Sequence, residues 1–174
     1  MKSNTSSLFI FLCIFSPAIS YGDQLRLPNG KTVDRSALPI VSYTSDVTPL
    51  HQAALEGRVD EAKRLVARGG DIEAKTNDGT TPIHSASVAG HPEVVEFLIS
   101  KHAKVDATDN EGRTPLHSAA MHGHVSVAKL LIAAGADVNR RIQLGKTAFT
   151  PLGLASLLGQ QEMEVFLAAH GGRE

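Results

Sequence analysis

The stretch Thr114-Pro115-Leu116-His117-Ser118-Ala119-Ala120 decides the fold of this chain, because closely related copies of it occur three more times. The other copies begin at Thr48, Thr81 and Thr150, so that successive copies start 33, 33 and 36 residues apart. Nine residues after each initial threonine stands a glycine: Gly57, Gly90, Gly123 and Gly159. Repetition at a fixed spacing of this size is typical of a solenoid built from stacked units.

Each unit carries the sequence signals of two helices. Threonine followed by proline favours a helix start, because the hydroxyl can cap free backbone N–H groups and the first helical position needs no donor. The glycine ends this helix, and apolar residues at helical spacing, such as Val94, Val95 and Leu98, predict a second one. His102 stands where two other units have a glycine after the second helix, so we expect left-handed backbone there.

The segment after each second helix predicts a projecting loop. Residues 71–79 combine an extended stretch with the turn sequence Asn77-Asp78-Gly79, which favours a hairpin-like projection. The three additional residues between Asn139 and Thr150 should lengthen one projection around residues 142–149. Upstream, Leu25–Val33 surrounds an Asn-Gly pair and predicts a separate short hairpin.

The repeated pattern resembles the ankyrin repeat in its T-P-L-H-x-A-A motif, its Gly-His pairs and the stretch Gly135-Ala136-Asp137-Val138-Asn139. The resemblance implies an all-α solenoid of helix-turn-helix units with short β-hairpin projections. It also implies that the repeated histidines bond to a neighbouring hairpin: His51, His84 and His117. Gly153 replaces this histidine in the last copy, which favours a C-terminal capping unit.

The first 20 residues have the pattern of a secretory signal peptide. Lys2 precedes the apolar run Leu8–Phe15, and Ala18 and Ser20 are small residues at the positions that a signal peptidase inspects. The run is shorter than the roughly 18 apolar residues of a membrane span. We therefore expect a cleaved signal peptide and a periplasmic or secreted protein with no membrane segment. An uncleaved membrane anchor is the main alternative, and a lipoprotein is disfavoured because Leu12 before Cys13 is too bulky for a usual lipobox.

This interpretation divides the chain into parts with different roles. Residues 1–20 are the expected signal peptide, and residues 21–47 are an N-terminal extension that covers the first repeat or remains partly mobile. Residues 48–174 form the repeats, with the expected boundaries 48–80, 81–113, 114–149 and 150–174.

Composition argues against several classes of function. With 17 Lys+Arg against 18 Asp+Glu and no Trp, the chain lacks the positive surplus that nucleic acid binding requires. Cys13, the only cysteine, lies in the expected signal peptide, so the remaining 154 residues have no thiol for catalysis, disulfides or zinc. Gly145-Lys146-Thr147 resembles the end of a P-loop, but Arg140 occupies the position of its required glycine.

Histidine and serine positions favour structural roles. The repeated histidines lie one unit apart and do not converge on one ion. His122 and His124 could supply half of a zinc site, so a small enzyme or metal protein is one alternative. Ser87 and Ser156 stand at the small-residue position of a helix pair, where we expect them to pack. The sequence therefore indicates no catalytic residue, metal or cofactor.

The predicted binding surface is the concave face formed by the first helices and the projecting loops. The residue after the small pair is apolar in every unit, which predicts a stripe along this face: Leu55, Val88, Met121 and Leu157. Half-buried packing is the other interpretation of the stripe. Neighbouring candidates for partner contact are Glu56, Asn77, Asp78, Asn110, Glu111, Arg113, His122 and Arg141.

These residues predict a monomeric, non-enzymatic protein that binds a partner protein of unknown identity. A dedicated inhibitor or protector of one exported enzyme is an alternative, distinguished by one-to-one stoichiometry.

Overall fold

The computed structural model describes residues 24–26, 32–34, 46–144 and 147–173. Contacts within the chain divide it into two units, residues 1–42 and 43–174. In the first unit, β1 (Gln24–Arg26) pairs antiparallel with β2 (Thr32–Asp34), which confirms the predicted hairpin. Its Asn-Gly turn and the expected signal peptide lie outside the described residues, and the domain boundaries stay predictions.

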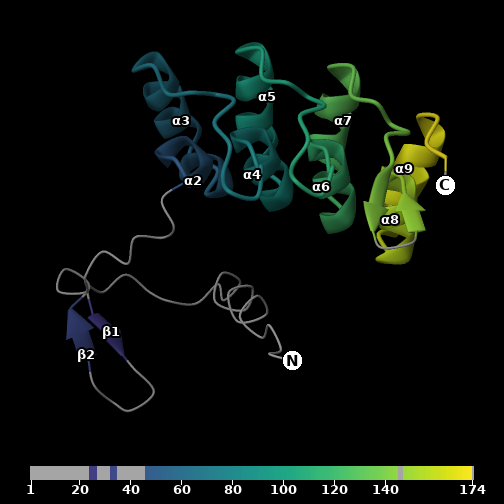
Figure 1. Cartoon of the computed structure of the whole chain (residues 1–174), viewed down its shortest axis with the longest axis horizontal. Helices are drawn as coiled ribbons and strands as arrows, with labels where there is room; N and C mark the ends of the chain where they lie inside the picture. The colour runs from purple at the N-terminus through teal and green to yellow at the C-terminus, as the bar shows by residue number, and fades with distance from the viewer. Residues whose placement is uncertain (1–23, 27–31, 35–45, 145–146, 174) are drawn as a thin grey trace. The chain divides into compact units, whose positions relative to one another are not determined.

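The second unit is a stack of helix pairs (Figure 1). Its first helices are α2 (Pro49–Leu55), α4 (Pro82–Ala89), α6 (Pro115–His122) and α8 (Pro151–Leu157). Its second helices are α3 (Val59–Ala67), α5 (Pro92–Ser100), α7 (Val125–Ala133) and α9 (Gln161–Ala169). Each helix contacts its counterpart in the next pair, which confirms the all-α solenoid.

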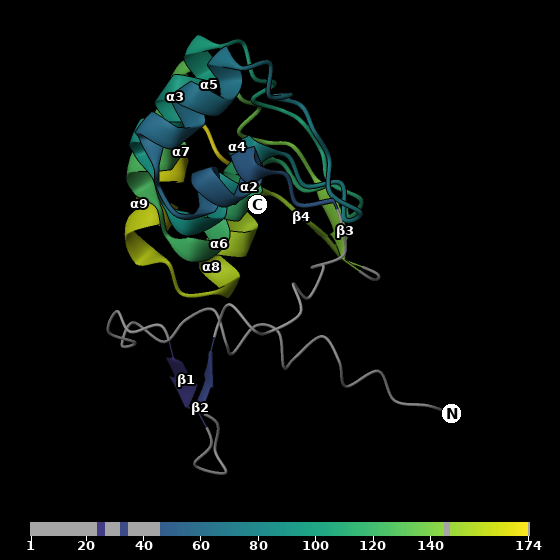
Figure 2. The same cartoon turned by 90° about the vertical axis from the view of Figure 1, so that its left-hand side faces the viewer.

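Loops project from the side of the first helices that faces away from the second helices (Figure 2). The last loop is a hairpin in which β3 (Ile142–Leu144) pairs antiparallel with β4 (Thr147–Phe149), so the additional residues do lengthen this projection. The loops before α4 and α6 are turns without paired strands, closed by hydrogen bonds such as that from Thr76 N–H to the Thr80 carbonyl. We call the surface formed by the first helices and these loops the inner face.

Small residues allow the first helices to stack closely. Ala54, Ala86, Ala119 and Ala155 are fully buried at the contacts between neighbouring pairs. Larger apolar side chains, including Leu98, Leu116 and Leu131, fill the space between the two helix layers without any exposure. Burying each of these leucines stabilises the fold by about 2 kcal/mol, so stability comes from contacts between successive pairs.

The turns between paired helices need glycine for two reasons. Gly90 adopts φ 76° at the end of α4, a conformation that costs a residue with a side chain. A Cβ atom at Gly90 would also lie 2.5 Å from Nδ1 of His124 in the next pair. At the end of α5, His102 has φ 65°, which confirms the left-handed backbone expected there.

Within the described residues, no helix combines the length and the apolar character that crossing a bilayer requires.

Candidate functional site

The repeated histidines tie each first helix to the following loop. His51 Nε2 lies 2.9 Å from the Thr80 carbonyl, and His84 Nε2 lies 3.1 Å from the Arg113 carbonyl. His117 Nε2 lies 3.1 Å from the Arg140 carbonyl. Nδ1 of each ring accepts a hydrogen bond from the backbone N–H of the capping threonine. Because that N–H can only donate, Nδ1 carries no proton and Nε2–H donates to the carbonyl. The structural role expected of these histidines is confirmed.

Burial favours the neutral form of all three rings. It lowers the pKa of His51 and His84, and it lowers the pKa of His117 to about 4. The bond to the Arg140 carbonyl acts in the opposite direction on His117 but has the smaller effect. These side chains therefore belong to the framework that positions the inner face.

A second set of side chains joins each pair to the stripe residue of the pair before it. His91 Nε2 lies 3.1 Å from the Leu55 carbonyl, and His124 Nε2 lies 3.0 Å from the Val88 carbonyl. Gln160 Nε2 donates to the Met121 carbonyl at 3.2 Å. The first three stripe residues therefore lie on backbone that the next pair holds in place.

The two histidines considered as half of a zinc site have other partners. His124 bonds to the preceding pair, and His122 Nδ1 lies 2.9 Å from the Ser118 carbonyl. Their rings stack with centroids 5.9 Å apart and an interplanar angle of 8°. Burial is the main cause that lowers the pKa of His124. In the part of the chain that the structure describes, no group of three or more His, Cys, Asp or Glu residues could hold a metal ion.

The four stripe residues keep part of their surface exposed. Leu55 is 39% exposed and Leu157 is 63% exposed, while Val88 and Met121 are half-buried. All four lie on the last two turns of successive first helices, which contact one another from α2 to α8. Partial exposure is compatible with partner contact and with half-buried packing, so the binding role of the stripe stays a prediction.

The candidate residues at the first two loop tips are linked to each other through the backbone. Asn110 N–H donates to the Asp78 carbonyl at 2.9 Å, and Asn110 Nδ2 donates to the Asn77 carbonyl at 2.7 Å. Asn77 N–H in turn donates to Asp46 Oδ2 at 3.0 Å. The structure thus brings these tips together and leaves their side chains on the surface.

Most charged candidates form ion pairs within their own segment. Arg113 Nε lies 2.7 Å from Asp109 Oδ2, and its Nη1 lies 3.0 Å from Glu111 Oε2. Glu56 Oε2 lies 2.7 Å from Arg58 Nε, at the end of α2. Arg141 is exposed immediately before β3. Glu56, Glu111 and Arg113 therefore have ion-pair partners within their own segments.

Sequence reasoning missed Asp109, which organises the second loop. This carboxylate is 8% exposed and accepts hydrogen bonds from the backbone N–H groups of Glu111 and Arg113. An aspartate that closes a turn over the next residues is a recognised loop signal, and Asp109-Asn110-Glu111-Gly112 carries it.

The last helix pair departs from the others at several positions. Gly153 N–H donates to the capping Thr150 Oγ1 as the histidine N–H does in other units, but the Thr150 hydroxyl itself donates to the Arg173 carbonyl. Glu164 is half-buried at a position where Val95 and Ala128 are fully buried. A polar outer surface is what the terminal unit of a solenoid requires.

The prediction that Ser156 packs between helix pairs is wrong. Its counterpart Ser87 is fully buried and donates to the Ile83 carbonyl at 2.7 Å, as expected of a packing residue. Ser156 is instead exposed, because nothing in the described part of the chain packs over the last pair.

Comparison with known proteins identifies the repeat. The family model for ankyrin repeats matches residues 27–109, 50–142 and 101–173, which together span residues 27–173. No curated protein gives a significant match to the chain.

Proposed function

Because the chain belongs to the ankyrin repeat family, whose repeats are generally non-enzymatic protein–protein interaction modules, we propose that it is exported and binds a partner protein through its inner face. Under this proposal the protein acts as a monomer and uses neither nucleic acid nor a cofactor. The stripe supplies the central apolar contact, and the loop tips supply the polar rim.

The observation that carries the proposal is the exposure of apolar side chains in register on successive helices. Exposed apolar surface lowers solubility, and a contiguous patch of it usually marks an interaction site. The neighbouring candidates Glu56, Glu111 and Arg113 are already paired with charges of their own segment. Shape and apolar contact therefore dominate recognition in the first three units.

Export rests on the sequence alone. The apolar run of residues 8–15 and the small residues Ala18 and Ser20 support signal peptide cleavage after Ser20. N-terminal sequencing of the native protein tests this part of the proposal. Intact Met1 on protein recovered from the soluble cytoplasm would contradict it.

The binding surface is tested with partners captured from the native extracytoplasmic fraction. Met121→Asp places a charge at the centre of the stripe, and its backbone carbonyl can still accept the bond from Gln160. If Met121 is an anchor, affinity falls about thirtyfold or more while the fold is retained. Lys129→Asp is the control, since Lys129 is exposed on α7 in the layer of second helices.

Two outcomes of the Met121→Asp experiment would contradict a binding role of the stripe. Unchanged affinity of folded Met121→Asp would rule out the stripe as the binding site. Unfolding of Met121→Asp would instead support half-buried packing. A fixed one-to-one complex with one exported enzyme, which changes that enzyme's activity or lifetime, would identify the protein as a dedicated inhibitor or protector.

A further inference from the structure

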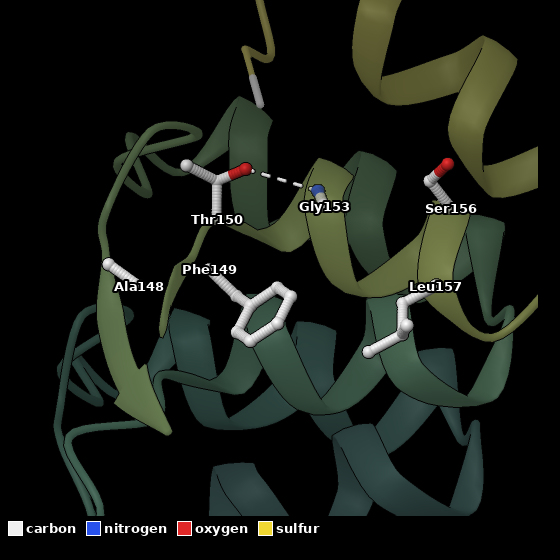
Figure 3. Close-up of a pocket in the computed structure, with 6 residues that line it drawn as sticks. All are labelled: Ala148, Phe149, Thr150, Gly153, Ser156 and Leu157. Carbon is white, nitrogen blue, oxygen red and sulfur yellow. Dashed lines mark hydrogen bonds between the residues drawn. The ribbon is translucent and has the colours of Figure 1, made fainter. Parts of the chain in front are cut away.

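A pocket of about 340 Å³ lies between β4 and α8 in the last unit (Figure 3). The residues that line it are Ala148, Phe149, Thr150, Gly153, Ser156 and Leu157. The side chains of Phe149 and Leu157 point toward one another across it. The pocket therefore has an apolar part formed by Phe149 and Leu157, the last residue of the stripe, beside the polar residues Thr150 and Ser156.

The pocket exists because the last unit departs from the repeat pattern. Gly153 has no side chain at the position where His51, His84 and His117 carry a buried ring. Ser156 and Leu157 are exposed, whereas the equivalent residues Ala120 and Met121 are buried and half-buried. The substitutions that cap the solenoid thus leave an open pocket large enough to hold one bulky apolar side chain.

Charge distinguishes this end of the inner face from the other. Between Asn139 and Gln160 the sequence contains Arg140, Arg141 and Lys146 and no acidic residue. Arg140 and Arg141 are exposed beside β3, and within the described residues neither forms an ion pair. The corresponding loops and first helices nearer the other end, residues 71–89 and 104–122, together contain 3 Lys or Arg against 6 Asp or Glu, so that part of the inner face is acidic.

We infer that this pocket binds one bulky apolar side chain from an acidic segment of the partner protein, an inference that rests on the proposed protein-binding function. Phe149 and Leu157 contact the side chain, and the arginines beside β3 attract the flanking carboxylates. The acidic part of the inner face repels the same segment. The partner would therefore bind in one direction along the stripe, with its acidic segment at α8.

The test uses labelled synthetic peptides and the purified full chain. The main probe is a short peptide with one leucine between flanking glutamates, and its binding is followed by fluorescence anisotropy. One comparison peptide replaces the leucine by serine, and another replaces the glutamates by lysines. We expect each change to weaken binding about tenfold or more, since the first removes the buried group and the second reverses the charge.

Variants locate the binding on the protein. Gly153→His restores the side chain of the other units, and its Cβ would make only ordinary contacts, 3.6 Å from Thr150 Oγ1 and 3.7 Å from Phe149 Cδ1. We expect this variant to bind the leucine peptide about tenfold more weakly. Arg141→Glu should weaken binding and reduce the preference for acidic flanks. Arg68→Glu makes the same charge change at the end of α3 and should leave the affinity unchanged.

Several results would overturn the inference. Equal binding of the serine and leucine peptides would show that no apolar side chain is buried. Wild-type affinity in folded Gly153→His would place the peptide elsewhere, and Leu157→Ser gives the same test if Gly153→His does not fold. If a captured partner no longer binds Met121→Asp but binds Gly153→His normally, the binding role of the pocket is refuted and the proposed function is not. A partner bound normally by both variants would refute the proposed function as well.

Discussion

The third and fourth helix pairs follow the same sequence template, yet they use it differently. In the third pair, His117, Ala120 and Ala128 are fully buried against the neighbouring pairs. Their counterparts in the fourth pair are Gly153, Ser156 and Glu164, none of which is buried. The stripe residue changes in the same direction, from half-buried Met121 to Leu157 at 63% exposure.

The difference shows that the neighbours of a repeat position decide its role. Between two pairs, the position after the T-P-L motif carries a histidine that fixes the next loop. At the end of the stack the capping threonine takes over that role, because the Thr150 hydroxyl donates to the Arg173 carbonyl. The terminal pair therefore has surface free for binding that an internal pair needs for packing.

The largest expected contrast between the two pairs concerns the leucine of the T-P-L motif. Leu116 is fully buried and Leu152 is 7% exposed. Leu116→Ala should destabilise the protein by about 4 kcal/mol, because both neighbouring pairs hold the cavity open. Leu152→Ala should cost about 2 kcal/mol, because one side can relax. Urea denaturation of both variants measures this contrast, and equal losses would contradict it.

Acidification should destabilise the internal pairs through their buried histidines. The unfolded pKa is near 6.5 and burial lowers the pKa of His117 to about 4, so its stabilising contribution is complete above pH 6.5. That contribution is lost as the pH falls from 6.5 toward 4, and the loss approaches about 3 kcal/mol for His117 alone. Thermal melting of the wild type and of His117→Gln should show a shallower pH dependence in the variant. Parallel curves for the two proteins would refute the assignment.

Two glycines with similar backbone angles allow the free-energy cost of a steric contact to be distinguished from the cost of left-handed backbone strain. Gly90 and Gly159 have φ 76° and 72°. A Cβ atom added at Gly90 would touch the His124 ring of the next pair, whereas one added at Gly159 would touch nothing within 4 Å. Gly159→Ala should cost about 1 kcal/mol through left-handed backbone strain. Gly90→Ala should cost about 2 kcal/mol, because the His124 ring must also move away from the Val88 carbonyl. Chemical denaturation compares the two, and an equal cost would show that the ring moves freely.

Most of the fold could be predicted from residues that repeat. The threonine–proline starts, the glycine ends and the left-handed His102 follow from local chemistry that each unit carries in its own sequence. The longer last loop could also be predicted, because additional residues between two fixed elements must project. The helices and the hairpin β3–β4 agree with these expectations.

The candidate site was less predictable, because exposure depends on what packs over a residue. Ser87 and Ser156 occupy the same repeat position, and only the structure shows that one is buried and the other exposed. The partner of His124 is a carbonyl 36 residues away, which no local pattern reveals. The sequence predicted a capping unit with Gly153 in place of the histidine, but it did not predict the pocket, because it expected Ser156 to pack.

The smallest expected effect concerns the stripe residues themselves. Met121 is half-buried, so Met121→Ala should reduce the free energy of unfolding by about 1 kcal/mol. Leu157 is 63% exposed, so Leu157→Ala should change it by less than about 0.5 kcal/mol. Alanine keeps the helix propensity of both positions high, so the comparison reports on side-chain burial. Equal losses in urea denaturation would mean that Leu157 is packed in solution as tightly as Met121, and the pocket that it lines would then be closed to a partner.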